Sequence, residues 1–337
     1  MPFRGHEGQP PGPADDPLAR FFELELAFDS QRGFLADRVP LRLVAANLVL
    51  TPGDALEIAA QVRAIAEQIR EQLSLLTDVV PAIRLLIAAV LLQRGDQPAA
   101  FFEEVERVRE IMRKLGLRRR EIFETVAILA LRIRNELAPI SEAQVERLRD
   151  IYEQMKRHHW LLTGPEDYPA CAFLVGQRER SPEQIGERAH AIYEGLRKRA
   201  RLWRGDPLQT ASNMLALSPL EPDELVERFC VLAEAFDRAG VRIRQFEYDE
   251  VAVLCFLARP TARIVETVVS YRDAIHERLR WTDRATAFGL GANLAFVRLV
   301  GNDPELGALA DAKTLLDMQT VIAARQAAAA AAAAGSA

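Results

Sequence analysis

The chain has 337 residues, of which 49% are hydrophobic and 27% are charged. This composition is typical of a globular protein with a large core, and the length allows two ordinary domains or one repeat array. The formal net charge of −5 excludes a general attraction to nucleic acids or anionic membranes, so such binding would require a local basic patch.

The N-terminal segment, residues 1–17, is rich in Pro, Gly and Asp, which predicts disorder. It lacks the apolar stretch of a signal peptide, and the longest apolar run, Leu85–Leu92, is too short to span a membrane. Three cysteines, Cys171, Cys230 and Cys255, show no paired spacing. These features predict a cytoplasmic protein with no membrane segment and no disulfide framework.

Short apolar segments recur along the chain at intervals of about 40 residues. They are residues 39–50, 81–93, 121–133, 167–176, 207–217, 248–258 and 286–297. Between them lie longer segments with one apolar stripe at helical spacing, as in Ile185, Ala189, Ile192 and Leu196. The pattern predicts alternating short buried helices and long amphipathic helices.

The starts of the longer helices repeat as well. Ser141–Gln144 and Ser181–Gln184 are capping boxes, the second with proline at the first helical position. No segment shows the alternation typical of a strand. The predicted fold is therefore all-α, with helical-hairpin repeats of about 40 residues that form an α-solenoid or a closed α/α toroid. The period alone does not distinguish these two arrangements.

The repeats are expected to form one domain, residues 18–325. Segments 18–36 and 304–325 are predicted to be helices that cap its two ends, because terminal repeats need a different outer face. The last residues, 326–337, form an Ala-rich, low-complexity tail.

One short helix, at residues 207–217, carries a polar stripe that the equivalent helix at 85–92 lacks. Gln209 and Asn213 are four residues apart and share a face. Asn47 and Asn293 occupy comparable positions in two other short helices. Buried amides need hydrogen-bond partners, so these side chains either bond to neighbouring repeats or give a common interior a polar lining.

Acidic residues open several of the short helices: Asp167 is followed by Tyr168, Asp206 opens the next helix, and an acidic loop precedes Tyr248. Capping and the helix dipole explain carboxylates at these positions. Because loops at the same phase of successive repeats meet on one rim, Asp167 and Asp206 are also candidates for acid–base chemistry.

Basic residues cluster at the opposite helix ends, and all but four of the 43 basic residues are arginine. The clusters are residues 113–120, 156–160, 196–204, 241–245 and 277–281. Helix dipoles explain them; the alternative is an arginine edge that follows a phosphate backbone, with tryptophan as a stacking surface. Acidic loops beside each cluster disfavour nucleic-acid binding. Trp160, Trp203 and Trp281 are expected to fill gaps between helices.

Signatures of metal sites and nucleophiles are lacking from the sequence. There is no HExxH, no GxSxG and no phosphate-binding glycine loop, and no histidine or cysteine pair has ligand spacing. We therefore expect no metal and no cofactor. The cysteines are interpreted as small buried hydrophobic residues.

Three stretches of the chain are distinctive: "LLTGPEDYPACAFLVG" at 161–176, "IYEGL" at 192–196 and "GDPLQTASNMLAL" at 205–217. They resemble an uncharacterised bacterial family, the domain of unknown function with number 4003. The resemblance extends over about Leu18–Val300 and implies no activity. It points to six positions for testing: Asp167, Tyr168, Pro169, Leu208, Gln209 and Ser212.

Three functional hypotheses follow. The first is a helical-repeat protein that binds a protein, peptide or small molecule on a surface or pocket formed by the short helices. The second is an enzyme of unknown reaction inside a helical ring, and the third is nucleic-acid binding along the arginine edge. Oligomeric state stays open. The candidate ligand-binding residues are Asp167, Tyr168, Asp206, Gln209, Asn213 and Asn293.

Overall fold

The computed structural model describes residues 16–31, 38–72, 81–119, 121–158, 163–279, 282 and 284–300. All regular structure in these ranges is helical, which confirms the prediction of an all-α fold. The first helix begins at Pro17, where Asp16 Oδ1 accepts a hydrogen bond from Ala19 N at 3.0 Å. The expected capping helix at 304–325 and the tail at 326–337 lie outside the described residues.

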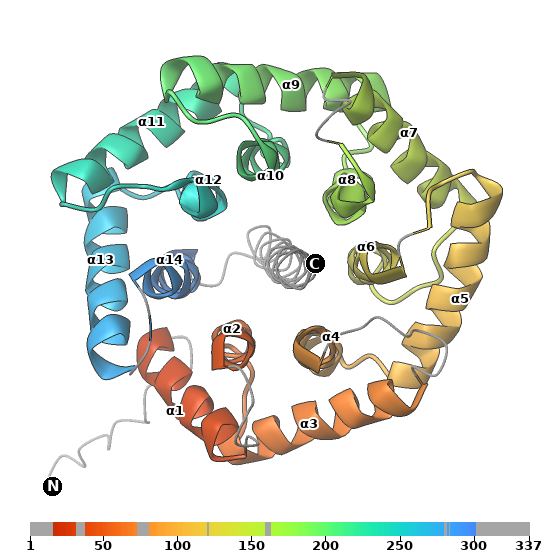
Figure 1. The fold of residues 1–337 in the computed structure, drawn as a ribbon, viewed down its shortest axis with the longest axis horizontal. Helices are drawn as coiled ribbons and strands as arrows, with labels where there is room; N and C mark the ends of the chain where they lie inside the picture. Colours follow the sequence, from red (N-terminus) through yellow and green to blue (C-terminus); the bar gives the residue numbers. More distant parts are fainter. Residues whose placement is uncertain are drawn as a thin grey trace, which may run out of the picture.

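The helices alternate between two positions in the molecule (Figure 1). The odd-numbered helices lie on the outside: α1 (Pro17–Ser30), α3 (Ala55–Gln72), α5 (Pro98–Lys114), α7 (Glu142–His158), α9 (Pro182–Arg199), α11 (Pro222–Arg238) and α13 (Thr261–Arg278). The even-numbered helices lie inside them: α2 (Arg38–Asn47), α4 (Pro81–Arg94), α6 (Glu121–Arg134), α8 (Tyr168–Leu174), α10 (Asp206–Leu215), α12 (Tyr248–Leu254) and α14 (Arg284–Val300). Short 3₁₀ turns, η2 (Pro165–Asp167) and η3 (Gln245–Glu247), precede α8 and α12.

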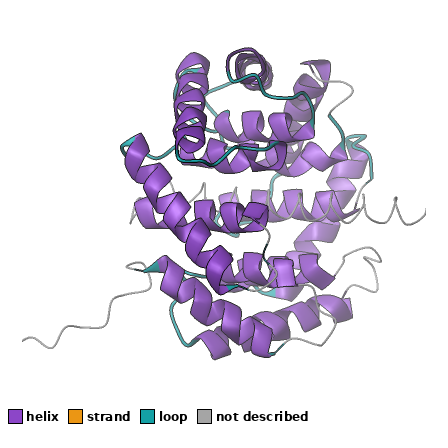
Figure 2. Ribbon diagram, turned by 60° about the vertical axis from the view of Figure 1, so that its left-hand side comes forward, coloured by secondary structure: helices purple, strands orange, loops and turns teal. Residues whose placement is uncertain are grey.

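The two ends of the described chain are neighbours. Helix α14 packs against α13 and α12, and it also contacts α1 and α2. Figure 1 shows the same arrangement, with α14 beside the first two helices. The view in Figure 2 shows the hairpins stacked from one repeat to the next.

The outer helices are amphipathic, as their sequence predicts. In α9, Ile185, Ile192 and Leu196 are fully buried against neighbouring helices, while most of the opposite face is exposed. The capping box at its start is formed, because Gln184 N donates to Ser181 Oγ at 3.3 Å and Ser181 N donates to Gln184 Oε1 at 2.8 Å. Propensity, capping and burial thus favour the same helix.

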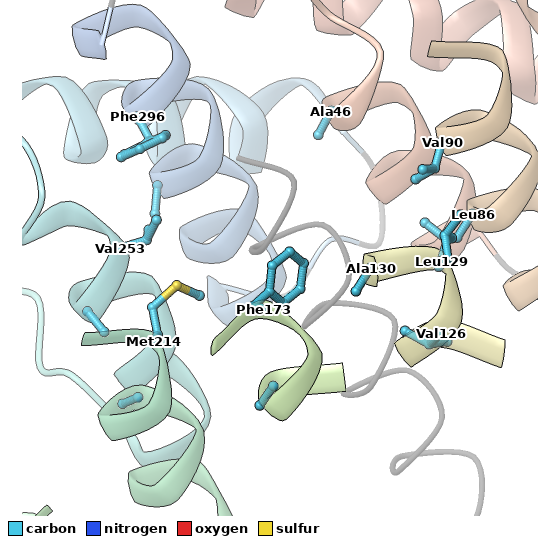
Figure 3. Close-up of a cluster of buried hydrophobic side chains, with 14 of the residues drawn as sticks. Ala46, Leu86, Val90, Val126, Leu129, Ala130, Phe173, Met214, Val253 and Phe296 are labelled. Atoms are coloured by element: carbon cyan, nitrogen blue, oxygen red, sulfur yellow. The ribbon is translucent and has the colours of Figure 1, made fainter. Parts of the chain in front are cut away.

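Two of the inner helices, α6 and α8, are buried on every side. All seven residues of α8 are buried, and so are residues 122–132 of α6. Side chains from the inner helices, including Leu129, Phe173, Met214 and Val253, form one apolar cluster (Figure 3). Such helices depend on the outer layer for their polar contacts, since few polar side chains are available on their own faces.

One arginine per repeat supplies such contacts. Arg107, Arg147, Arg188 and Arg228 follow each other at intervals of 40 or 41 residues on α5, α7, α9 and α11. Each donates to a backbone carbonyl in the segment between the end of the next inner helix and the following outer helix; the acceptors are Ile140 (2.5 Å), Val175 (3.1 Å), Ser218 (3.0 Å) and Cys255 (3.3 Å). The last carbonyls of a helix have no partner within it. A guanidinium can also bond to several carbonyls at once, as Arg147 does at Val175, which follows the end of α8, and at Gln177 and Arg180 in the loop before α9.

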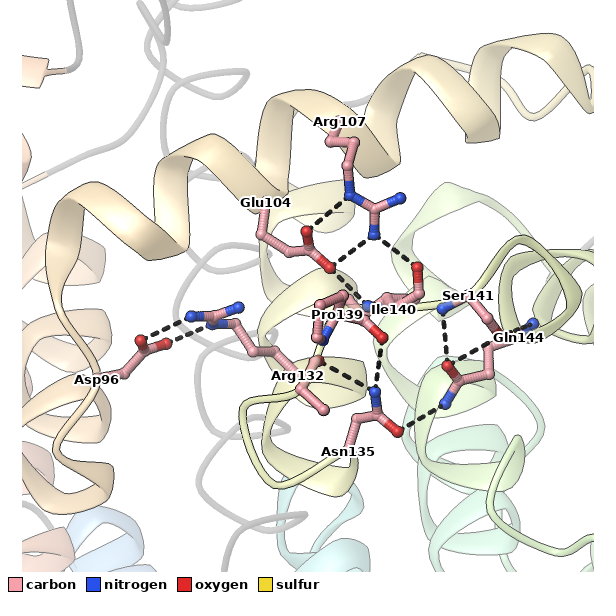
Figure 4. Close-up of polar contacts among 10 residues, drawn as sticks. Asp96, Glu104, Arg107, Arg132, Asn135, Pro139, Ile140, Ser141 and Gln144 are labelled. Atoms are coloured by element: carbon pink, nitrogen blue, oxygen red, sulfur yellow. Dashed lines mark hydrogen bonds and ion pairs between the residues drawn. The ribbon is translucent and has the colours of Figure 1, made fainter.

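A buried ion pair connects two successive repeats (Figure 4). Asp96, in the turn between α4 and α5, accepts from Arg132 Nη2 near the end of α6 at 2.8 Å. Both side chains are less than one tenth exposed. In the same region Glu104 binds Arg107 and accepts the Ile140 backbone N–H at 2.6 Å. These contacts fix α5 and α6 relative to α4.

Candidate functional site

Three of the predicted site residues lie together where α8 and α10 begin. Asp167 ends η2, directly before α8, while Asp206 and Gln209 lie in the first turn of α10. The side chain of Gln209 is within hydrogen-bonding reach of Asp167, and its Nε2 donates to Thr163 Oγ1 at 3.2 Å. Asp206 is exposed and places its negative charge beside Asp167.

Asp167 is the most unusual acid of this group. Its side chain is buried, and its Oδ2 accepts the Gly164 backbone N–H at 3.1 Å. Burial, with a smaller effect of Glu166 and Asp206, raises the pKa of Asp167 to about 8. The folded acid is therefore mainly protonated at pH 7 and has an O–H to donate. Gln209 Oε1, which is buried and has no hydrogen-bond donor among the described residues, is a suitable acceptor.

Tyr168 is held in the interior by ring packing and a hydrogen bond. Its side chain is fully buried, and its ring packs edge-on against Tyr152 with centroids 4.9 Å apart. Its hydroxyl donates to the Arg118 carbonyl, 50 residues earlier, at 3.3 Å. Tyr168 therefore connects its repeat to the preceding one.

The two predicted asparagines occupy different places. Asn213 lies on α10 one turn after Gln209; it is buried, and its Nδ2 has no acceptor among the described residues. Asn293 is half-buried on α14, from which α12 separates α10. The structure thus brings together Asp167, Asp206 and Gln209, and it leaves Asn293 outside this group.

A cavity of about 670 Å³ lies elsewhere, against α5 and the start of α6. Ala99, Phe102, Val105 and Leu117 give it an apolar wall. Arg109 and Glu124 also line it, and they form an ion pair with 3.2 Å between Nε and Oε2. Arg109 Nη2 donates further to Thr125 Oγ1 at 2.9 Å. Neither Asp167 nor Gln209 borders this cavity.

Sequence reasoning missed the cavity and its charged pair. The side chains of Arg109 and Glu124 are only 17% and 7% exposed. Glu124 is the one charged residue between Ile122 and Leu131 of an otherwise apolar segment. That charge was the available signal, because a buried carboxylate requires a partner from another element.

Comparison with known proteins identifies the family. A family model described as "Protein of unknown function (DUF4003)" matches residues 44–327. The chain belongs to this family. A relative, "Uncharacterized protein YeaA" of Bacillus subtilis (strain 168), is 26% identical over 219 residues, which are 64% of this chain and 63% of YeaA. The chain thus spans less than two thirds of that relative. No solved structure matches the chain.

Several arginines in the basic clusters of this DUF4003 protein pair with neighbouring acids. Arg199 pairs with Glu227, and Arg197 binds Glu194 at 2.7 Å. Arg119 contacts Glu121 at 2.5 Å. Such pairs reduce the positive potential that a phosphate backbone would need.

The expectation that tryptophans fill gaps between helices is wrong for Trp203, whose residue is 74% exposed. It lies in the loop between α9 and α10, where its backbone N–H, and not its ring, makes the inter-repeat contact. Trp160 and Trp281 lie outside the described residues. Cys171 and Cys255 are buried, in agreement with their interpretation as small hydrophobic residues, and Cys230 is partly buried.

Two searches of the described DUF4003 residues were negative. No three His, Cys, Asp or Glu side chains in these ranges are grouped closely enough to hold a metal ion. Within the same ranges, every helix is too short or too polar to cross a membrane.

Proposed function

We propose that the repeats close into an α/α toroid and that the protein acts by binding a small ligand. The contacts of α14 with α1 and α2 support the closed arrangement over an open solenoid, because the ends of an open array have no reason to meet. Closure fixes the outer helices relative to one another, which favours a preformed binding site.

The ligand site we propose is the cavity against α5 and α6. Its volume of about 670 Å³ suits a small molecule. The single observation that carries the proposal is the largely buried Arg109–Glu124 pair at its wall. This pair presents charges of both signs at the wall of the cavity, and a bound polar group can interact with both of them there.

The chemistry of the wall indicates the ligand class. Glu103, Glu106 and Arg113 add charges of both signs around the apolar surface of Phe102 and Leu117. A small zwitterion with an apolar side group, such as an amino acid or dipeptide, matches this distribution because it presents both charges and an apolar part.

Thermal unfolding in the presence of amino acids and dipeptides tests this proposal. A ligand at 100 times its Kd should stabilise the fold by about 2.7 kcal/mol. Ala99→Trp, which fills the cavity, should abolish the shift; Ala262→Trp, at the equivalent second position of α13, should keep it. An equal shift in both variants would exclude this cavity as the site.

A second candidate is acid–base chemistry at Asp167 with Asp206 and Gln209, and the raised pKa of Asp167 is the observation that favours it. In a screen for hydrolysis of small esters and amides, Asp206→Asn should abolish turnover without changing the unfolding temperature. Unchanged turnover would refute this role. A pure binding protein would show no turnover in either form.

A further inference from the structure

A second cavity lies where the repeat of α11 and α12 meets that of α13 and α14. Its volume is about 360 Å³, and it shares no lining residue with the cavity against α5 and α6. Three segments line it: the loop from α11 to η3 together with that turn, the second half of α13, and the first turns of α14. The cavity therefore depends on the packing of successive repeats and not on one helix alone.

The apolar part of its wall is held in place by local structure. The chain leaves α11 through Gly240, whose φ of 75° lies in the left-handed region that favours glycine. The Val241 N–H then donates to the Phe236 carbonyl at 2.9 Å. Val241 and Phe288 are buried at the wall, and the ring of Phe288 packs edge-on against Phe236 with centroids 5.4 Å apart. A wall fixed in this way favours a preformed site.

Each of the three segments contributes arginine to the cavity. Arg242 and Arg244 come from the loop, Arg272 from α13, and Arg284 from the start of α14. The first two belong to the basic cluster at residues 241–245. Unlike the paired arginines of α9, Arg242, Arg244 and Arg284 form no ion pair with another residue of the described chain. Their charges are available to a ligand.

The acids at the cavity do not balance these charges. Glu247 Oε2 accepts the Arg244 backbone N–H at 2.7 Å within the η3 turn, and Asp273 Oδ1 lies 2.6 Å from Arg272 Nη2. Among the described residues of the wall, four arginines and two carboxylates give a net charge of +2. The first turn of α14 contains no acid, so the positive end of its dipole adds to this charge. The wall is therefore suited to a doubly charged anion.

We propose that this cavity binds a small organic phosphate, that is, a phosphate monoester with a compact apolar group. Such a monoester carries about two negative charges at neutral pH. Arginine binds phosphate oxygens through two parallel N–H donors, and the apolar group has Val241 and Phe288 to contact. The volume of about 360 Å³ exceeds that of a phosphate ion alone and suits a small molecule. This site requires neither the zwitterion cavity nor closure of the ring.

Calorimetric titration of the full chain with phenyl phosphate, at constant ionic strength and about pH 7.5, tests the proposal. We expect one site per chain. Arg244→Gln and Arg284→Gln should each weaken binding by about tenfold or more, because each variant removes a charged donor. Arg204→Gln is the matched control and should bind as the wild type does. Arg204 is exposed in the loop before α10, 40 residues before Arg244, and does not line the cavity.

The variants distinguish a site from general attraction. Arg204, Arg244 and Arg284 are all exposed, so their replacement should leave the unfolding temperature unchanged. Equal weakening in the three variants would mean that the anion responds only to surface charge, and it would overturn the proposal. A wild type that shows no saturable binding at millimolar phenyl phosphate would overturn it as well.

Two further titrations test the class of ligand. Inorganic phosphate should bind more weakly than phenyl phosphate, because it cannot contact the apolar wall. Benzoate, which has the same ring and a single negative charge, should also bind more weakly. Inorganic phosphate that binds as tightly as phenyl phosphate would refute the assignment to an organic phosphate. Benzoate that binds as tightly would refute the preference for a phosphate group.

Discussion

Two turns of the molecule have the same geometry and different surroundings. At η2, Asp167 Oδ2 accepts the backbone N–H of Gly164; at η3, Glu247 Oε2 accepts that of Arg244 at 2.7 Å. In both, the acid lies three residues after its donor and is followed by the tyrosine that begins the inner helix. An acid at this position is therefore a requirement of the turn itself.

The surroundings distinguish the two acids. Asp167 lies with Thr163, Gln209 and Asp206, and burial keeps it largely protonated at neutral pH. Glu247 borders a cavity of about 360 Å³ that is lined by arginines, including Arg242, Arg244 and Arg272. The two turns share an acid and a tyrosine, whereas the polar group around Asp167 belongs to one of them only.

The largest effect should come from removing the shared tyrosines. Tyr168→Ala and Tyr248→Ala each delete a buried aromatic ring, which costs about 3–5 kcal/mol of unfolding free energy. Urea denaturation of both variants checks this. A Tyr168→Ala variant with native stability would show that Tyr168 has no structural role and would restore it as a ligand-binding candidate.

The next effect tests the difference between the two acids. The folded pKa of Asp167, about 8, lies above its ordinary value of 3.8. The protonated acid therefore stabilises the fold fully below the unfolded pKa, and this stability is lost as the pH rises through 8. Between these values, unfolding free energy should fall by at most about 1.4 kcal/mol per pH unit.

Asp167→Asn should remove that slope, because the amide is neutral at every pH and still accepts from Gly164. Denaturant unfolding at intervals between pH 5 and pH 9 measures it. Glu247→Gln is the control from the equivalent turn. If wild type and Asp167→Asn show the same pH dependence, the acid is not held protonated in the folded state.

The sequence allowed part of this arrangement to be predicted. Helical stripes and capping boxes define the repeats, and the shared register of α8 and α10 brings Asp167 close to Gln209, as expected. The role of Tyr168 could not be predicted, because its partner, Arg118, is 50 residues away and is a backbone carbonyl. The cavity beside Arg109 depends on how side chains from two helices pack, which no local pattern records.

The contacts of the repeated arginines could be predicted from the sequence only in part. Their spacing of 40 or 41 residues is visible in the chain, yet arginine on the polar side of a helix is indistinguishable from ordinary surface charge. Only the structure shows that Arg188 is buried and donates to the carbonyls of Ser218 and Leu220.

A third prediction concerns the backbone carbonyls that follow the inner helices, whereas the first two concern the turns that precede them. Arg188→Met should lower the unfolding free energy by about 1.5–3 kcal/mol, since buried carbonyls lose a charged donor. Arg197→Met, on the same helix, breaks a more exposed pair with Glu194 and should cost less than about 1 kcal/mol. Equal losses would mean that the carbonyl contacts contribute no more than a surface ion pair.

The smallest expected loss of stability comes from removing the hydroxyl groups of the two tyrosines, one at each turn. Tyr168→Phe and Tyr248→Phe keep both rings and delete one hydroxyl each. Tyr168 donates to a carbonyl, whereas Tyr248 Oη lies 3.4 Å from the Trp203 backbone N–H and accepts from it in an exposed loop. Tyr168→Phe leaves a carbonyl without its donor and should cost about 1 kcal/mol. Water can replace the acceptor for Trp203, so Tyr248→Phe should cost less. The reverse order in urea unfolding would show that the inter-repeat contact of Tyr248, and not that of Tyr168, is the stronger connection.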